Sequence, residues 1–276
     1  MLVRQSSPSQ HTTVTIAGVP VGGPSMVVIA GPCAAESETQ LCTVAECLTR
    51  LDIRLLRAGV YKPRTSPYSF QGLQDEGLQL LHDIKRAYGL GIVSEVMSVA
   101  HLERAYEVFD CFQVGSRNMQ NFELLKALGQ VRKPVLLKRG LAATIEELLG
   151  AAEYILAGGN RQVILCERGI RSFDPATRNV LDLGAVALLK RLTHLPVIVD
   201  PSHATGRREL VIPAARAAVA VGADGLIVEC HPVPQQSVSD AAQALSLDEL
   251  EQLVCETARV AQAVGRQLPY PVERAA

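Results

Sequence analysis

Residues 135–166 read VLLKRGLAATIEELLGAAEYILAGGNRQVILC, and this stretch decides the fold class. Two short apolar segments, VLLK and VILC, flank a polar loop and a segment with helical periodicity. Thr144 and Glu147 fit a capping box, in which the two side chains satisfy backbone N–H groups at a helix start. Continuous apolar strands are typical of parallel sheets covered on both faces. The stretch therefore predicts a strand–helix–strand unit of an α/β protein.

The same unit recurs on both sides of this stretch. Ser37 with Gln40 and Ser246 with Glu249 also fit capping boxes, and Gly89 and Gly158 occupy the places of C-terminal glycine caps. Eight strands are expected, at residues 27–30, 54–57, 92–96, 111–115, 135–138, 163–166, 197–199 and 226–228. Eight such units predict a single (β/α)8 TIM barrel, with a doubly wound open sheet as the structural alternative.

The residues before the first strand predict a small addition to the barrel. In TVTIAGVPVGG (13–23), valines and an isoleucine alternate around Ala17-Gly18, a pattern that indicates a short β-hairpin. We expect the hairpin to close the bottom of the barrel. The predicted organisation is an N-terminal tail and hairpin at 1–24 and a catalytic barrel at 25–268.

Composition excludes several classes of protein. With 27 basic and 28 acidic residues the net charge is −1, which argues against a general nucleic-acid binder. The chain has no run of the ~18–20 apolar residues that a membrane span needs, and the first residues do not resemble a secretory signal. The seven cysteines form no CxxC pair, so we expect a reducing, cytoplasmic location.

The predicted strand ends carry the chemistry. In a (β/α)8 barrel the loops after the strands converge on one mouth, where catalytic groups lie. An ionisable residue lies at or just after each of the eight predicted strand ends: Cys33, Arg57, Glu95, Arg117, Lys138, Arg168, His203 and Glu229.

Positive charge is concentrated at this predicted mouth. The six basic residues are Arg57, Lys62, Arg64, Arg117, Lys138 and Arg168. Guanidinium groups match phosphate and carboxylate oxygens in pairs, and lysine adds a point charge. The set predicts a highly anionic ligand; the alternative is that these side chains form surface salt bridges with helix carboxylates.

A second set combines Cys33, His203, Glu229 and Asp240. Thiolate, imidazole and carboxylate donors suit Mn, Fe, Co or Zn. The alternative is a buried apolar cysteine and a hydrogen-bonded loop histidine. Cys230 should point away from such a site, because successive strand residues face opposite sides. His231 is open to a supporting role.

Longer motifs carry a family resemblance. They are AGPCAAES (30–37), RAGVYKPRTSPYSFQGL (57–73), SEVM (94–97), VGSRNMQN (114–121), LLKRG (136–140), ERGIRSFDPATRN (167–179), DPSHATG (200–206) and VECHP with SDAAQAL (228–245). Together they resemble the 3-deoxy-7-phosphoheptulonate synthases, in particular the short type I-beta branch without an added regulatory domain. The sister enzymes that make 3-deoxy-manno-octulosonate 8-phosphate usually read KANRSS where this chain reads KPRTS.

The resemblance implies roles for individual residues. Arg57, Lys62 and Lys138 would bind the carboxylate of phosphoenolpyruvate (PEP), and Arg117, Lys138, Arg168 and the N–H near Ser116 would bind its phosphate. Arg64, Thr65 and Ser66 would bind the phosphate of erythrose 4-phosphate. Cys33, His203, Glu229 and Asp240 would ligate a divalent metal, with Mn²⁺ preferred over Fe²⁺, Co²⁺ or Zn²⁺. Lys62 is the preferred proton donor, Glu95 would orient the attacking water, and His203 completes the catalytic set.

The implied activity is condensation of PEP with erythrose 4-phosphate, the first step of the shikimate pathway. Three alternatives stay open: an octulosonate synthase using arabinose 5-phosphate, a synthase of secondary metabolism, and a non-catalytic anion-binding barrel. We expect a homodimer or homotetramer that binds no nucleic acid and no membrane. We also expect no inhibition by aromatic amino acids, chorismate or prephenate.

Overall fold

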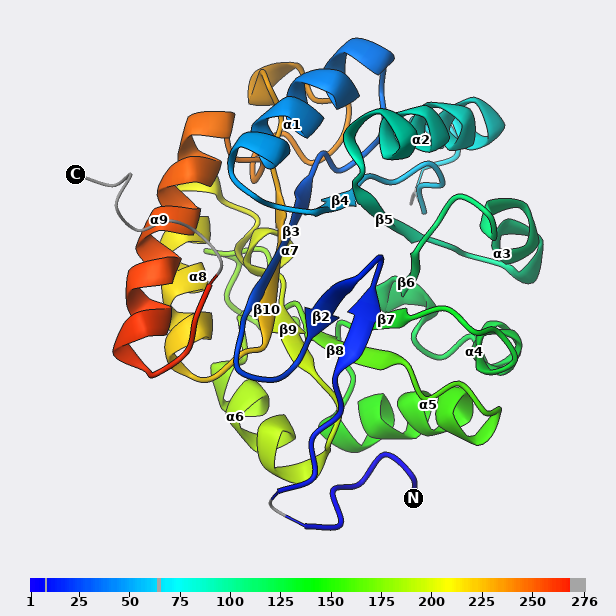
Figure 1. Cartoon of the computed structure of the whole chain (residues 1–276), viewed down its shortest axis with the longest axis vertical. Helices are drawn as coiled ribbons and strands as arrows, with labels where there is room; N and C mark the ends of the chain where they lie inside the picture. The colour runs from blue at the N-terminus through cyan, green and yellow to red at the C-terminus, as the bar shows by residue number, and fades with distance from the viewer. Residues whose placement is uncertain (8, 64–65, 269–276) are drawn as a thin grey trace.

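A closed barrel of eight parallel strands forms the centre of the protein (Figure 1). The computed structural model describes residues 1–7, 9–63 and 66–268. The barrel strands are β3 (Val27–Gly31), β4 (Leu55–Arg57), β5 (Gly91–Glu95), β6 (Cys111–Val114), β7 (Val135–Lys138), β8 (Val163–Glu167), β9 (Val197–Val199) and β10 (Gly225–Glu229). They pair in sequence order, and β10 closes the ring on β3. The predicted barrel is confirmed, the open sheet is wrong, and the strand bounds differ from the expected ones by one residue at most.

Helices surround the barrel on the outside, as Figure 1 shows. They are α1 (Glu38–Arg50), α2 (Gln74–Tyr88), α3 (Val99–Ala105), α4 (Phe122–Gly129), α5 (Ile145–Ala157), α6 (Leu183–Leu192), α8 (Arg208–Ala220) and α9 (Leu247–Ala263), with the short α7 (Pro201–Thr205) after β9. The largest apolar cluster lies between the strands and these helices. Among the described residues, no helix has the length and apolarity needed to cross a bilayer.

Two of the three predicted capping boxes are complete. At the start of α5, the Thr144 hydroxyl accepts from the backbone N–H of Glu147, and the Glu147 side chain accepts from the backbone N–H of Thr144. Ser246 and Glu249 form the same pair of hydrogen bonds at the start of α9. At α1 only half of the box forms. The Ser37 hydroxyl accepts from the N–H of Gln40, but the Gln40 side chain accepts from the N–H of Glu36 instead of Ser37.

The two predicted glycine caps differ. Gly89 ends α2 in the left-handed conformation, with φ 66°, as expected. Gly158 is the C-cap of α5, as predicted, but its φ of −69° is not left-handed, and the positive φ of 109° falls on Gly159. A Cβ on Gly158 would lie 2.7 Å from Cα of Gly129. Gly158 therefore permits the close approach of the chain ends of α4 and α5.

The predicted hairpin closes one end of the barrel. It consists of β1 (Val14–Ile16) and β2 (Val19–Val21), and Figure 1 shows it lying across the strands. Val14, Ile16 and Val21 are buried in one cluster with the inward-facing side chains of the strands. At the amino end of β5, a Cβ on Gly91 would lie 2.6 Å from Cβ of Ala17, so the hairpin turn sits directly on that strand end.

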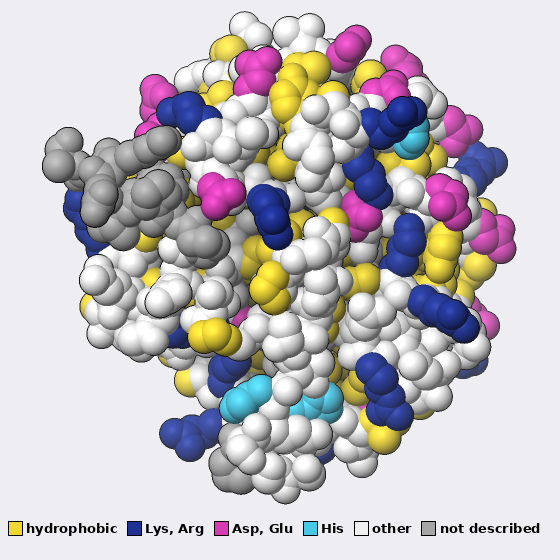
Figure 2. Space-filling view, viewed as in Figure 1, with side chains coloured by type: hydrophobic (Ala, Val, Ile, Leu, Met, Phe, Trp, Pro, Cys, Tyr) yellow, Lys and Arg dark blue, Asp and Glu magenta, His cyan; other side chains and the backbone are white. Residues whose placement is uncertain are grey.

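Charged side chains of the described residues are spread over this closed end. Figure 2, from the same side as Figure 1, shows basic and acidic side chains interspersed over the surface. Because the hairpin occupies the amino ends of the strands, the carboxyl ends are left to form the open mouth.

Candidate active site

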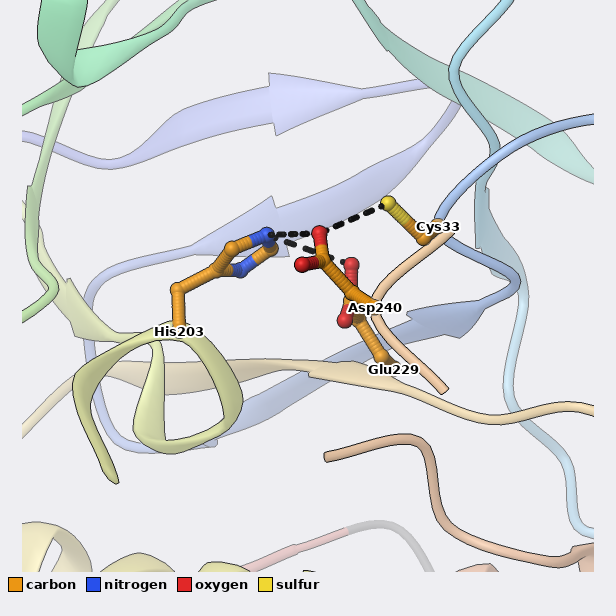
Figure 3. Close-up of side chains that lie close together, drawn as sticks. All are labelled: Cys33, His203, Glu229 and Asp240. Atoms are coloured by element: carbon orange, nitrogen blue, oxygen red, sulfur yellow. Dashed lines mark hydrogen bonds and ion pairs between the residues drawn. The ribbon is translucent and has the colours of Figure 1, made fainter. Parts of the chain in front are cut away.

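Four side chains converge at the carboxyl end of the barrel: Cys33, His203, Glu229 and Asp240 (Figure 3). Their donor atoms all lie within 4.8 Å of one another. The Cys33 sulfur is 3.2 Å from Oδ2 of Asp240, and Nε2 of His203 is 3.2 Å from Oε1 of Glu229. Ligands about 2.0–2.3 Å from one ion lie up to roughly 4.6 Å apart, so this cluster fits a metal without large rearrangement. The prediction that these four residues lie together at one end of the barrel is confirmed.

Cys33 is positioned by hydrogen bonds between the segment after β3 and the segment after β4. The N–H of Gly59 donates to the carbonyl of Cys33 at 3.0 Å, and the N–H of Ala35 donates back to Gly59 at 3.0 Å. This extended ladder places the loop after β4 beside Cys33. As a result, the ammonium nitrogen of Lys62 lies 2.9 Å from the Cys33 sulfur.

The loop after β10 returns to bring in the second carboxylate. The N–H of Leu245 donates to the carbonyl of Glu229 at 2.9 Å, which ties the end of the loop to the end of the strand. Asp240 has φ 56°, a left-handed conformation that aspartate tolerates better than most residues. Cys230 is buried in the cluster between strands and helices, so the prediction that it points away from the site is confirmed. His231 contacts Glu36 at 3.3 Å.

The outer oxygens of the two carboxylates are also held. Gln243 donates to Oε2 of Glu229 at 2.6 Å. Arg178 donates to Oδ1 of Asp240 at 3.1 Å and to the side-chain oxygen of Gln243 at 3.0 Å. One guanidinium and one amide therefore orient both carboxylates. This pair was not predicted, because nothing in the spacing of residues 178 and 243 along the chain indicates it.

His203 is oriented by the residue that caps its helix. Asp200 accepts from the backbone N–H of His203 through Oδ1 at 2.9 Å, and its Oδ2 lies 2.7 Å from Nδ1 of the ring. A carboxylate only accepts, so Nδ1 carries the proton and Nε2 faces Glu229 and Asp240. Oδ2 of Asp200 also accepts from Nζ of Lys138. Asp200 was not predicted, although an acidic residue directly after a strand and before Pro201 is a signal in the sequence that could have identified it.

Burial and charge set the protonation of these groups. Burial and the charge of Glu229 raise the pKa of the Cys33 thiol to about 11. Burial opposes ionisation of Asp240, but His203 and Arg178 outweigh it and lower the pKa to about 2. Burial also opposes ionisation of Glu229, and His203 and Arg57 lower its pKa. The carboxylates are thus ionised near neutral pH, and a metal would displace a proton from the thiol.

A cavity of about 570 Å³ opens beside the cluster. It is lined by His203, Asp240, Glu95, Ser66 and Ser116, which the sequence had singled out, and by seven basic residues: Arg57, Lys62, Arg117, Lys138, Arg168, Arg171 and Arg178. Five of the six predicted cations are among them. The sixth, Arg64, lies outside the described residues, as does Thr65. Arg171 and Arg178, on the loop after β8, were missed.

Two of these cations pair with buried carboxylates of the site itself. Arg57 lies 2.6 Å from Oε1 of Glu229, with their side chains 5% and 1% exposed. Lys138 pairs with Asp200. The alternative of surface salt bridges to helix carboxylates is therefore wrong for Arg57 and Lys138. Burial lowers the pKa of Arg168, the third deeply buried cation of the lining.

Glu95 reaches the cavity because its neighbour has no side chain. Glu95 ends β5, and Gly115 follows β6 beside it. A Cβ on Gly115 would lie 2.0 Å from Oε1 of Glu95, closer than atoms can approach. The glycine therefore leaves the space that the carboxylate occupies.

Comparison with known proteins identifies the family of this chain. Residues 9–266 match the model of the DAHP synthetase I family. The chain belongs to this family. DAHP is 3-deoxy-D-arabino-heptulosonate 7-phosphate, so the family is the one that the motifs had indicated.

Several known proteins are similar to this chain over most of their length. The phospho-2-dehydro-3-deoxyheptonate aldolase of Thermotoga maritima is 48% identical over 96% of this chain and 78% of its own. Its crystal structure superposes with a TM-score of 0.93 over 97% of this chain and 78% of that chain, and a truncated form gives 0.90 over 97% and 98%. The 2-dehydro-3-deoxyphosphooctonate aldolase of Syntrophotalea carbinolica is 33% identical over 88% of this chain and 94% of its own.

Proposed function

We propose that this protein condenses PEP with erythrose 4-phosphate and water to give DAHP and inorganic phosphate. The observation that carries the proposal is the mixed-donor cluster of Cys33, His203, Glu229 and Asp240 beside a cavity lined by seven basic side chains. Two phosphates and a carboxylate need such a density of positive charge. Family membership and the 48% identity to the Thermotoga enzyme support the four-carbon sugar over the five-carbon one.

The basic lining divides between the parts of PEP. Arg57, Lys62 and Lys138 bind its carboxylate and the neighbouring oxygens. Arg117, Lys138 and Arg168, with the backbone N–H near Ser116, bind its phosphate. The proposal is supported by their common cavity and by the depth of Arg57, Lys138 and Arg168, whose exposed fractions are 4–5%. Arg64, Thr65 and Ser66 bind the phosphate of erythrose 4-phosphate; of these only Ser66 is among the described residues, and it lines the cavity.

The four cluster residues hold a divalent metal, with Mn²⁺ as the proposed ion and Fe²⁺, Co²⁺ or Zn²⁺ as alternatives. When bound, such an ion supplies Lewis acidity toward a carbonyl oxygen. Two further proposals are a cytoplasmic location, which rests on the cysteine pattern, and a homodimeric or homotetrameric assembly, which rests on the family resemblance. Light scattering on the purified protein would measure the assembly.

The reaction makes one C–C bond between the two substrates and one C–O bond from water, and it breaks the C–O bond to the phosphate of PEP. The methylene carbon of PEP attacks the aldehyde carbon of erythrose 4-phosphate while the basic residues hold both in contact. Lys62 donates a proton to the alkoxide that forms. Glu95 orients a water that adds at the carbon bearing the phosphate, and inorganic phosphate leaves. The position of Lys62, against the cluster and on the cavity wall, supports its assignment.

Phosphate release from PEP tests the proposal. It is measured with erythrose 4-phosphate or arabinose 5-phosphate, each with and without Mn²⁺. We expect release with erythrose 4-phosphate that depends on Mn²⁺. Preference for arabinose 5-phosphate would instead assign the octulosonate activity, and no release with either aldose would favour a non-catalytic anion-binding barrel.

A further inference from the structure

Asp200 is a buried carboxylate that contacts both halves of the site. Its Oδ2 accepts from Nδ1 of His203 at 2.7 Å and from Nζ of Lys138. The side chain is 1% exposed, so solvent does not compete for this oxygen. His203 belongs to the metal cluster and Lys138 to the basic lining of the cavity. One oxygen is therefore shared between a metal ligand and an anion-binding cation.

We propose that Asp200 is a positioning residue that couples the two halves, so that Mn²⁺ and PEP each tighten the binding of the other. The inference rests on the proposed function, because it takes His203 as a metal ligand and Lys138 as a PEP ligand. Asp200 touches neither Mn²⁺ nor PEP in this proposal. It acts through its two hydrogen-bond donors.

The direction of the coupling follows from competition for Oδ2. A cation at Nε2 withdraws electron density from the imidazole of His203, which makes Nδ1–H a stronger donor to Asp200. Lys138 then loses part of its counter-charge, and its ammonium attracts an anion more strongly. Conversely, an anion that draws Lys138 toward itself leaves Oδ2 to His203 and makes the ring a better ligand. Thermodynamic linkage requires that both effects have the same factor.

A second contact acts in the same direction. Arg57, proposed to bind the PEP carboxylate, lies 2.6 Å from Oε1 of Glu229, and that oxygen is 3.2 Å from Nε2 of His203. A cation that takes up the charge of Glu229 leaves Arg57 freer to bind an anion. Glu229 is itself a cluster residue, so its replacement would remove the metal site. Replacement of Asp200, by contrast, leaves every proposed ligand of Mn²⁺ and of PEP in place, so the coupling can still be measured.

The coupling factor is measured without turnover. Metal-stripped protein is titrated with Mn²⁺ with and without saturating PEP, in the absence of aldose, by calorimetry because the chain has no tryptophan. We expect PEP to lower the Mn²⁺ dissociation constant about 5- to 50-fold, within the usual range of coupling between sites. In Asp200→Asn, which keeps the size and the Oδ1 acceptor for the helix cap, Mn²⁺ affinity should fall about 10- to 100-fold. The coupling factor is the ratio of the Mn²⁺ dissociation constants without and with PEP. In this variant it should fall at least about threefold, and the factor that remains is due to direct attraction between Mn²⁺ and PEP.

Asp224→Asn is the matched control. Asp224 is also buried and bound to a lysine, at 2.6 Å from Nζ of Lys190, but it lies before β10, away from the mouth. This control should keep the wild-type coupling factor. A role of Asp200 in stability alone would weaken both affinities and leave the factor unchanged, and that result would overturn the inference.

Measurements on the wild-type protein test the inference even if Asp200→Asn does not fold. A wild-type coupling factor of one overturns the inference. In Zn²⁺-loaded protein, addition of PEP should move the ¹⁵N resonance of His203 Nδ1, and an unmoved resonance counts against it. Failure of the wild type to bind Mn²⁺ or PEP at all would instead reject the proposed function, so the two failures are distinguishable.

Discussion

The ammonium nitrogen of Lys62 lies 2.9 Å from the sulfur of Cys33 and 3.0 Å from its carbonyl oxygen. This contact places a proton donor against the metal cluster. Lys62→Met keeps the aliphatic stem and removes the donor, and we expect turnover to fall by about 10²-fold or more, the scale of general acid catalysis. Phosphate release at saturating substrates measures it. Lys126→Met, at an exposed ion pair on α4, should leave turnover unchanged; near-wild-type turnover of Lys62→Met would show that another group donates the proton.

Removal of the metal should abolish activity without unfolding the protein. The cluster lies at the mouth, whereas two separate apolar clusters fill the space between the strands and helices and the inside of the barrel. EDTA treatment followed by elemental analysis should give inactive protein with unchanged circular dichroism, and Mn²⁺ should restore phosphate release. Full activity in protein shown to be free of metal would contradict the Lewis-acid role.

Replacement of Gln243 should weaken metal binding. Its amide holds Oε2 of Glu229 at 2.6 Å and its oxygen accepts from Arg178. In Gln243→Leu we expect Mn²⁺ affinity to fall about 10- to 100-fold, as for other residues that orient metal ligands. Calorimetric titration measures the change. Gln252→Leu, on the exposed side of α9, is the control, and equal affinities in the two variants would refute the orienting role.

A buried ion pair beside the cavity should matter for stability. Arg139 lies 2.9 Å from Glu167, which is fully buried and also accepts from the N–H of Gly169 at 2.6 Å. Glu167→Gln should lower the free energy of unfolding by about 3 kcal/mol, because the buried guanidinium of Arg139 loses the buried one of its two carboxylate partners. Asp182→Asn removes the other, partly exposed carboxylate at 3.0 Å and should cost about 1 kcal/mol or less. Urea denaturation compares them, and a smaller effect for Glu167→Gln than for Asp182→Asn would contradict this assignment.

Alkaline pH should destabilise the protein through buried thiols. Burial raises the pKa of the Cys111 thiol above its ordinary value of 9.0. Above pH 9 the unfolded chain loses this proton while the folded chain keeps it, so stability is fully present below pH 9 and falls as pH rises. From pH 8 to 10, Cys111→Ala should lose about 1.4 kcal/mol less unfolding free energy than the wild type. Equal losses would mean that Cys111 ionises in the folded state.

The sequence by itself determined the barrel and most of the site. Apolar strands such as VLLK and VILC can be covered on both faces only in a parallel sheet, and eight of them with alternating helices close into a ring. The ring places every strand end at one mouth, which is why Cys33, His203 and Glu229 could be grouped from a linear chain. Local signals also sufficed for the caps at Thr144 and Ser246, whose partners are three residues away.

Only the tertiary structure decided which distant residues form hydrogen bonds or pack closely against each other. Gln243 reaches Glu229, and Arg178 reaches Asp240, because the loop after β10 folds back along its strand; no spacing encodes that path. Gly158 caps α5 as the sequence predicted, but its contact with Gly129, 29 residues away, could not be predicted from the chain. Periodicity and strand ends are determined by chain geometry within a few residues. A hydrogen bond such as the one that Lys138 donates to Asp200 depends instead on how segments far apart in the sequence pack together.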